Sequence, residues 1–390
     1  MVGNASEGTV NRAQMTPSEP KIEPERLAER LAALPGIERL REAAAGLPAY
    51  LVGGAVRDLL LGRERADLDV AVEGEVAELA RRLGGEARAD ERFGTAAVRV
   101  DGLEIDLAAT RSETYARPGA LPEVRRASLA ADLARRDFTV NAMAVPLAGD
   151  PEPIDPHGGL EDLRRGELRV LYPGSFVDDP TRALRAARYA ARYGFALERD
   201  TEELCRRADL STVSRDRAEA ELRKLAAEPQ AHRAFELLGE WGLLELEPGA
   251  LELVAAVREL TTAEPWREVA GGADAVLAAA LGRGVGEARE LASVEPARPS
   301  EAVARARGRS GVELALARAL GAAWLDRYVT EWRGVRLEID GNDLIAEGVA
   351  EGPAVGRGLG EALRAKLDGE VDGRREELRA ALDAARENAS

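Results

Sequence analysis

Two aspartates in the first fifth of the chain, Asp67 and Asp69, have the spacing needed to act together. They open the segment Asp-Leu-Asp-Val-Ala-Val, in which acidic and apolar residues alternate. On a strand, residues two positions apart project from the same face, so the two carboxylates would lie side by side. Mg²⁺ relieves the repulsion between such carboxylates, because it takes oxygen ligands and shares them with substrate phosphates. The alternative is a pair of solvated aspartates at a strand end.

A second alternating segment, Glu-Ile-Asp at 104–106, raises the question of a third carboxylate. Asp106 is either an acidic neighbour of the pair on an adjacent strand or an exposed strand residue, and the sequence leaves both open.

A glycine pair precedes the aspartates and has the form of a phosphate-binding turn. Gly53 and Gly54 follow the apolar run that ends at Val52, and a helical pattern begins directly after them. Glycines let a backbone approach a phosphate closely, and the first turn of a helix offers free amide groups. Arg57 lies one turn into that helix, where it can reach the same anion. A plain tight turn is the alternative interpretation of the glycines alone.

The segment Arg-Arg-Asp-Phe-Thr-Val-Asn at 135–141 combines a cation with hydrogen-bond acceptors. Arg136 can bind a phosphate or a ribose, and Asp137 beside it can accept from ribose hydroxyls. Asn141 adds a short side chain that both donates and accepts. The alternative is a surface Arg-Asp pair that leads into a core strand. It explains any single pair, but it explains the whole segment less well.

The segment Asp-Asp-Pro-Thr-Arg at 178–182 opens a helix that carries arginines three residues apart. Pro180 suits the first helical turn, and Asp179 can cap it. The arginines then form a stripe along one side of the helix at Arg182, Arg185 and Arg188. A capped helix with a basic solvated face is the alternative.

An aspartate and an arginine one turn apart can read a nucleobase without a template. Asp179 would accept from an exocyclic amino group, and Arg182 would donate to the neighbouring ring nitrogen. Cytosine and adenine both present that pattern, whereas uracil and guanine present the reverse. A good bidentate match discriminates by about 1–3 kcal/mol, so the pair predicts a site for CTP and ATP.

The elements that must position these residues change in type along the chain. Short apolar runs predict strands, and between them the periodicity of Val76–Leu83 predicts a helix. The expected strands are Tyr50–Val52, Leu68–Val72, Ala96–Val100, Leu103–Ala108 and Val140–Val145. Residues 24–47 look helical, and helical periodicity continues from about Thr181 to the end. The fold class is therefore α+β, with a small mixed-sheet head followed by an all-helical remainder.

Composition limits the chemistry further. The chain has 390 residues with 54 basic and 70 acidic side chains, a net charge of −16, which argues against general coating of nucleic acid. One cysteine, Cys205, and two histidines leave little for a zinc site, so any metal must bind carboxylates. Apolar runs are too short to cross a bilayer and no signal core is visible, so we expect a cytoplasmic protein that contacts no membrane and requires no protein partner.

Taken together, these segments resemble the class II tRNA nucleotidyltransferases of the DNA polymerase beta-like superfamily, the family of bacterial CCA-adding enzymes and poly(A) polymerases. The matching elements occur in family order over about residues 49–225. The first three are Gly-Gly-x-x-Arg-Asp with Asp-x-Asp (53–69), Arg-Arg-Asp-Phe-Thr-Val-Asn-Ala-Met (135–143) and Asp-Pro-x-Gly-Gly (155–159). The last two are the Asp-Asp-x-x-Arg motif with the helix that it opens (178–188), and Arg217 with Glu221. The stretch at 341–356 resembles the C-terminal helical region of many such bacterial enzymes.

The resemblance implies a role for each group. Asp67 and Asp69 would bind two Mg²⁺ ions, Gly53, Gly54 and Arg57 the triphosphate, and Arg136, Asp137 and Asn141 the sugar side of the nucleotide. Base and phosphate recognition would fall to Asp179, Arg182, Arg185 and Arg188. The implied domains are a flexible tail (1–24), a catalytic head (25–172), a helical neck for base recognition (173–228) and a body and tail for tRNA binding (229–390).

The implied activity is the addition of C, C and A from CTP and ATP to the 3′ end of tRNA. The family's CCA-adding pattern often has Glu where Asp178 stands, and Ser112–Val124, the family's flexible loop, resembles versions from both CCA-adding and A-adding members. An A-adding or CC-adding enzyme therefore stays an alternative, followed by a poly(A) polymerase or a noncatalytic RNA-binding protein.

Overall fold

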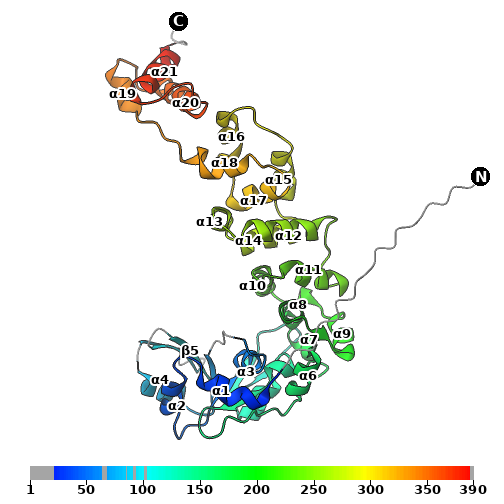
Figure 1. The fold of residues 1–390 in the computed structure, drawn as a ribbon. Helices are drawn as coiled ribbons and strands as arrows, with labels where there is room; N and C mark the ends of the chain where they lie inside the picture. The colour runs from blue at the N-terminus through cyan, green and yellow to red at the C-terminus, as the bar shows by residue number, and fades with distance from the viewer. Residues whose placement is uncertain (1–21, 64–67, 85, 91–93, 101–102, 387–390) are drawn as a thin grey trace, which may run out of the picture. The chain divides into compact units, whose positions relative to one another are not determined.

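The computed structural model describes residues 22–63, 68–84, 86–90, 94–100 and 103–386. Contacts divide the chain into two units, Met1–Ala218 and Glu219–Ser390. Among the described residues, every strand lies in the first unit and the second is built from helices (Figure 1). The α+β prediction is confirmed. The unit boundary falls inside the predicted neck, 173–228, and the four-part domain division stays a prediction.

A six-stranded mixed sheet forms the frame of the first unit, in the order β3-β4-β5-β2-β1-β8. The central neighbours β2 and β5 run parallel, and the other pairs in this sheet are antiparallel. The strands are β1 (Ala49–Val52), β2 (Leu68–Val72), β3 (Glu86–Asp90), β4 (Thr95–Val100), β5 (Leu103–Ala109) and β8 (Ala144–Pro146). Two smaller pairs complete the unit: β6 (Arg111–Thr114) with β7 (Glu123–Arg126), and β9 (Glu167–Leu168) with β10 (Ala196–Leu197).

Helices of the first unit pack on this frame through regular apolar stripes. In α4 the buried residues Val76, Leu79, Ala80 and Leu83 follow the helical period, and the helix matches its predicted bounds. Figure 1 shows α4 beside α2, which it contacts. The remaining helices of the unit are η1 (Pro24–Arg26), α1 (Leu27–Ala32), α2 (Ile37–Ala43), α3 (Gly54–Leu60), α5 (Leu129–Ala134), η2 (Thr139–Asn141), α6 (Gly159–Arg165), α7 (Ser175–Asp178), α8 (Thr181–Tyr193), α9 (Arg199–Cys205) and η3 (Leu210–Thr212).

The predicted strand Val140–Val145 is wrong over its first half. Residues Thr139–Asn141 form the 3₁₀ turn η2, and only Ala144–Pro146 pairs with β1. The Asn141 side chain donates to the Asp137 carboxylate at 2.9 Å, and the Ala142 amide donates to the Thr139 carbonyl. Such local bonds offer the backbone an alternative to a strand ladder, and periodicity alone does not reveal them.

The segment that resembled a flexible loop, Ser112–Val124, contains the loop of a hairpin, with strand residues at both of its ends. Its strands β6 and β7 pair antiparallel from Arg111 opposite Arg126 to Thr114 opposite Glu123. All four residues of β7 are exposed, so this strand lacks the alternation by which strands are recognised in a sequence.

The second unit packs helix on helix. Its small C-terminal core includes Leu344, Ala362 and Ala381, and a Cβ atom on Gly358 of α20 would lie 2.5 Å from the Ala381 carbonyl oxygen, so α20 and α21 cross closely there. None of the described helices is both long and apolar enough to span a membrane. The boundary falls within α10 (Arg215–Ala226), and the helices after it are α11 (Ala231–Glu240), α12 (Ala250–Leu260), α13 (Trp266–Ala270), α14 (Ala273–Ala280), α15 (Val285–Ala292), α16 (Pro299–Ala306), α17 (Gly311–Ala319), α18 (Leu325–Thr330), η4 (Trp332–Gly334), α19 (Gly341–Ala346), α20 (Pro353–Leu367) and α21 (Arg374–Arg386).

Candidate active site

Two carboxylates meet on the parallel pair at the centre of the sheet. Asp69 of β2 lies directly opposite Asp106 of β5 in the strand register. The sequence neighbours of both residues are buried, whereas Asp69 is half-buried and Asp106 is exposed, so the two carboxylates share the open face of the sheet. Asp67, the other predicted member of the acidic pair, lies outside the described residues.

This acidic face suits a hard divalent cation. Neighbouring strands are about 4.8 Å apart, a spacing at which two in-register carboxylates can share one ion. Within the described part of the chain, no group of three or more potential metal ligands is present. Asp69 and Asp106 therefore fit Mg²⁺ by donor type and placement, with Asp67 as the candidate for a further ligand.

The glycine turn lies next to the acidic face because β1 and β2 are antiparallel. Leu51 pairs with Val70, so the end of β1 at Val52 lies beside the beginning of β2, where Asp69 stands. Gly53 then turns the chain into α3 with φ +67° and ψ −127°, a backbone conformation that residues other than glycine rarely adopt. The register places the glycine turn beside Asp69.

Arg136 lies against the glycine turn. A Cβ atom on Gly53 would be 2.6 Å from Nη1 of Arg136, so only glycine lets the guanidinium come this close. Arg136 also donates from Nη2 to Asp132 at 2.9 Å and from Nη1 to the Asn141 carbonyl at 3.3 Å. Its Nε is buried without a hydrogen-bond partner among the described residues. Two predicted phosphate-directed groups, the turn and Arg136, are thus brought together.

Asp132 was not predicted from the sequence, yet it holds both arginines of the motif. It is 2% exposed, and its carboxylate accepts from Arg135 and Arg136. Burial alone would raise the pKa of Asp132, but the charges and hydrogen bonds of the two arginines outweigh it and lower that pKa. The spacings of three and four residues along one helical turn were the available signal.

Arg57 is buried rather than open to a ligand. The residue is 5% exposed, and its guanidinium donates to Asn141 Oδ1, to the Tyr193 hydroxyl and, at 3.0 Å, to Asp58. Its guanidinium also lies over the Tyr193 ring, 4.4 Å from the centroid. Arg57 therefore connects the glycine-turn helix α3 to the 135–141 segment and to the end of α8.

The buried carboxylate of Asp137 forms an ion pair with the partly exposed Arg185, which joins the two motifs that carry them. Arg185 donates to Asp137 Oδ2 from Nε at 2.8 Å and from Nη2 at 2.6 Å, while Oδ1 accepts from the Phe138 amide and from Asn141. Burial alone would raise the pKa of Asp137, but the charge of Arg185 and the hydrogen bonds from Arg185 and Asn141 outweigh it and lower that pKa to about 2. Asp137 is therefore a charged acceptor held in place by α8.

Asp179 and Arg182, the predicted base-reading pair, have different partners. Asp179 Oδ1 accepts from Thr181 and from Arg217 at 3.0 Å. Arg182 is 5% exposed and donates to Ser175 at 2.6 Å and to the Arg135 carbonyl at 2.7 Å. Among the described residues no hydrogen bond joins the two side chains to each other. Each is fixed separately, one by α10 and the other by α7 and the Arg135 turn.

The tip of the β6–β7 hairpin reaches the same region. Gly119 is buried, and its amide donates to the carbonyls of Val177 and Asp178 while its carbonyl accepts from Arg217 at 2.8 Å. With φ +67°, a Cβ there would lie 2.5 Å from the Thr212 carbonyl oxygen. The hairpin tip is thus held against α7 and the first turn of α10.

Aromatic rings, which the sequence analysis did not include in the site, pack among the arginines of α8. Tyr189 lies under Arg188, whose guanidinium is 4.9 Å from the ring centroid, and its hydroxyl accepts from Arg185. Tyr193 donates to Asp58 at 3.0 Å. Their spacing of four residues within an arginine stripe was the signal that could have indicated this role.

Comparison with known proteins agrees with this arrangement. The family model described as the Poly A polymerase head domain matches residues 49–169. The A-adding tRNA nucleotidyltransferase of Aquifex aeolicus is 44% identical over 209 residues, which cover 51% of this chain and 25% of that protein. The CC-adding tRNA nucleotidyltransferase of Deinococcus radiodurans is 42% identical over 208 residues, with coverages of 51% and 55%. The chain spans between a quarter and about half of the length of these curated relatives.

Solved structures match over nearly the whole chain. A CCA-adding enzyme in an apo form has a TM-score of 0.76 at 27% identity, covering 92% of this chain and 98% of the other. The Thermotoga maritima CCA-adding enzyme complexed with tRNA has a TM-score of 0.70 at 28% identity, with coverages of 93% and 98%. CCA-adding enzymes complexed with ATP and with CTP match at 0.74 and 0.72. Residues 49–169 of this chain thus match the Poly A polymerase head domain, and the chain is similar to tRNA nucleotidyltransferases and CCA-adding enzymes.

Proposed function

We propose that the protein is a template-independent tRNA nucleotidyltransferase that adds C, C and A from CTP and ATP to the tRNA 3′ end. The observation that carries the proposal is the in-register pair of Asp69 and Asp106 on parallel strands, beside the turn at Gly53. Phosphoryl transfer requires a site for divalent cations next to a site for the triphosphate. The acidic face and the glycine turn provide that combination.

In the reaction, the terminal 3′-hydroxyl oxygen of the RNA attacks the α-phosphorus of the nucleotide in line. One oxygen–phosphorus bond forms, the bond to the bridging oxygen of the β-phosphate breaks, pyrophosphate leaves with that electron pair, and the hydroxyl proton is released to solvent. Asp67 and Asp69, with Asp106, would hold two Mg²⁺ ions. When bound, Mg²⁺ lowers the pKa of the attacking hydroxyl and neutralises charge that develops on the phosphate.

Substrate binding falls to the groups around the turn. Gly53 and Gly54 offer backbone close to the triphosphate, and Arg136 brings a cation to the same place. Asp137 stays ionised and would accept from a sugar hydroxyl of the nucleotide in addition to its bonds within the protein. Arg57 and Asn141 act by positioning, because their hydrogen bonds tie the turn to the segment that carries Arg136.

Base recognition rests on Asp179 and Arg182, and the arginines Arg185 and Arg188 continue the site along α8. Arg217 anchors Asp179 through Oδ1 only, so within the described structure Oδ2 remains available to accept from the amino group of cytosine or adenine. Arg182 uses Nη1 and Nη2 for its internal bonds, which leaves Nε as a donor to the ring nitrogen. The rigid placement of both side chains favours discrimination, because a mismatched base leaves a buried polar group unpaired.

Sequencing of product 3′ ends tests the proposal. Three tRNA transcripts, lacking CCA, ending in C and ending in CC, are each incubated with CTP, ATP, both or UTP, and the added nucleotides are read. Addition of C, C and A in order, with no UTP incorporation, supports the proposal. Addition of A only to the CC end, or of C only, identifies a specialised enzyme, for which relatives of both kinds exist. Unlimited A tails indicate a poly(A) polymerase, and no incorporation refutes catalysis.

A further inference from the structure

Tyr193, the last residue of α8, lies where this helix meets the glycine-turn helix α3. Its hydroxyl accepts a hydrogen bond from Arg57 Nη2 and donates one to Asp58 Oδ1 at 3.0 Å. Burial raises the pKa of Tyr193 to about 12, so the hydroxyl stays protonated and remains a donor at neutral pH. Because Arg57 and Asp58 are both buried and Asp58 also accepts from Arg57 Nε, the three side chains form one closed hydrogen-bonded group.

Arginines also lie against the ring of Tyr193. The Cζ atoms of Arg57 and Arg63 are each 4.4 Å from the ring centroid, a distance at which a cation is attracted to an aromatic ring. Phe195 stacks on the same ring, with the two centroids 5.4 Å apart. Arg63 follows α3, and its amide donates to the Asp58 carbonyl at 2.9 Å. The ring therefore contacts one arginine within α3 and another just beyond the end of that helix.

Arg57 in turn packs against the glycine turn. A Cβ atom on Gly54 would lie 3.3 Å from Arg57 Nη2, the same nitrogen that donates to Tyr193. The backbone amide of Arg57 also donates to the Gly53 carbonyl at 3.2 Å. Because so little space separates the guanidinium from the turn, a displacement of Arg57 would also displace the turn.

Two chains of hydrogen bonds run from α8 to the carboxylate of Asp137. The first is direct, because Arg185 donates to Oδ2 of Asp137 at 2.8 and 2.6 Å. The second begins at Tyr193, two helical turns further along α8, and passes through Arg57, which donates to Asn141 Oδ1. Asn141 then donates to Oδ1 of Asp137 at 2.9 Å. The place of Arg57 relative to Asp137 therefore depends on Tyr193.

We propose that Tyr193 is a positioning residue for nucleotide binding, which fixes Arg57 and thereby the distance between the glycine turn at Gly53 and the acceptor Asp137. This rests on the proposed function for the nature of the ligand. The turn would contact the triphosphate and Asp137 the sugar, and CTP and ATP share both parts. Tyr193 therefore acts on the two nucleotides alike and leaves the choice of base unchanged.

Equilibrium binding of CTP and ATP analogues tests the assignment. Each analogue carries a methylene group between the α- and β-phosphates, and binding is measured with Mg²⁺ and without tRNA. Tyr193→Phe removes the hydroxyl and keeps the ring, whereas Tyr193→Leu removes both. We expect Kd to rise by about three- to tenfold in Tyr193→Phe and by roughly tenfold or more in Tyr193→Leu, because small misplacements of binding groups are costly. The factors should be equal for the two analogues.

Steady-state incorporation separates this role from base reading and from folding. KM for CTP and for ATP should rise by the same factors while kcat stays within about twofold, since the turn and Asp137 would contact the nucleotide in the ground state and the transition state alike. The ratio of UTP to CTP incorporation should equal that of wild type. A tyrosine with a merely structural role would lower the amount of folded enzyme and leave KM unchanged.

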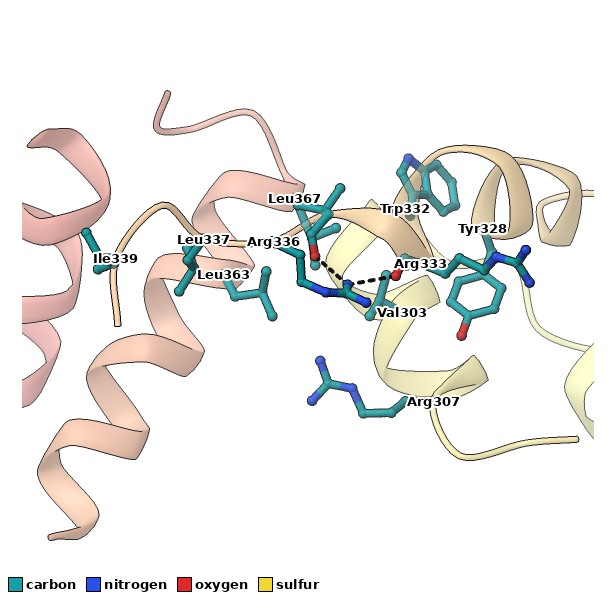
Figure 2. Close-up of a pocket in the computed structure, with 11 residues that line it drawn as sticks. Val303, Arg307, Tyr328, Trp332, Arg333, Arg336, Leu337, Ile339, Leu363 and Leu367 are labelled. Carbon is teal, nitrogen blue, oxygen red and sulfur yellow. Dashed lines mark hydrogen bonds between the residues drawn. The ribbon is translucent and has the colours of Figure 1, made fainter. Parts of the chain in front are cut away.

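Two aromatic residues of the second unit give matched controls. Tyr328 and Trp332 line a hollow of about 560 Å³, and Figure 2 shows the Tyr328 hydroxyl without a hydrogen bond to the other residues drawn. Tyr328→Phe thus removes a hydroxyl that has no such partner. Trp332→Leu removes a ring that also lies against an arginine, because Arg327 Cζ is 4.7 Å from its centroid. Both controls should bind the analogues like wild type.

Each outcome has a defined meaning. Analogue affinities within about twofold of wild type in both Tyr193 variants overturn the assignment, as does a change confined to one nucleotide, a fall in kcat at unchanged KM, or an equal loss in the controls. A wild type that binds the analogues but adds no nucleotide contradicts the proposed function, and the binding comparison still decides the role of Tyr193. A wild type that binds neither analogue contradicts both. Thermal unfolding of Tyr193→Phe, expected close to wild type, shows that the binding loss is not a loss of fold.

Discussion

Arginines in the two units of this protein have opposite surroundings. Around the glycine turn, Arg57 and Arg182 are buried and donate to neighbouring side chains and carbonyls. On the second unit, Arg307 and Arg333 are exposed and have no acidic partner among the described residues. The same residue type is therefore buried and hydrogen-bonded in one region and exposed in the other. Substitutions in the first region should change chemistry, selectivity or folding, whereas those at the exposed arginines should leave the chemistry and the folding close to wild type.

The substitution Asp69→Asn should have the largest effect on catalysis. Removing one carboxylate charge from the acidic face should lower the rate of nucleotide incorporation by roughly 10³-fold, since metal ions supply several kcal/mol of transition-state stabilisation. Affinity for tRNA should stay within about twofold of wild type. Single-turnover incorporation and equilibrium binding of the same tRNA measure the two effects. A loss of affinity equal to the loss of rate would count against a catalytic role.

Arg182→Ala is expected to relax base choice. Loss of the donor to the ring nitrogen should raise UTP incorporation relative to CTP by roughly ten- to a hundredfold, because a bidentate contact is worth about 1–3 kcal/mol. Arg199, which is largely exposed on α9, gives a control in Arg199→Ala. Competition between UTP and CTP in one reaction gives the ratio directly, and unchanged rejection of UTP would remove Arg182 from the base-reading role.

Gly53→Ala tests whether the turn and Arg136 are packed as closely as the structure has them. We expect a loss of about 1–3 kcal/mol in the free energy of unfolding, from the positive φ and from contact with Arg136. Gly149→Ala is the matched control, because Gly149 has φ +79° with nothing within 4 Å of the Cβ position. The double variant Gly53→Ala/Arg136→Ala should recover the steric part of the loss. Equal losses in the two glycine variants would show that Arg136 does not press on the turn.

Because the pKa of Asp137 is lowered in the folded protein, we expect the free energy of unfolding to depend on pH. Its pKa is about 2 in the folded protein against an ordinary 3.8, so its contribution is complete above about pH 4 and is lost as pH falls toward 2. The shift corresponds to about 2 kcal/mol in the free energy of unfolding. Denaturant unfolding of wild type and Asp137→Asn between pH 2 and 6 measures the difference, which should shrink as the pH falls. A difference that stays constant over that range would contradict the charged pair with Arg185.

Local patterns explain which parts of the fold were predictable. The strand Leu68–Val72 and the helix Val76–Leu83 have the predicted bounds, because the strand is a short apolar run that is almost wholly buried and the helix buries its apolar residues at the helical period. The hairpin strand Glu123–Arg126 exposes every residue, and Thr139–Asn141 turns through side-chain hydrogen bonds, so neither follows such a period. The helical stretch predicted for 24–47 is divided into η1, α1 and α2, with Gly36 at φ +68° before the last of them.

The candidate site was predictable in its residue types but not in its pairings. Spacing identified Asp69, Gly53 and Arg136, and the structure brings the turn and Arg136 together. Asp179 pairs with Arg217, 38 residues away, and Arg57 with Tyr193, 136 residues away. Such contacts depend on how the elements pack, which the spacing of residues in a motif does not encode.

The most direct test of the account is CTP incorporation by Asp67→Ala into a tRNA that lacks CCA, measured alongside binding of that tRNA. The account predicts that incorporation is abolished at saturating CTP while the tRNA affinity and its salt slope equal those of wild type. Incorporation at the wild-type rate would contradict the assignment of the acidic face as the metal site.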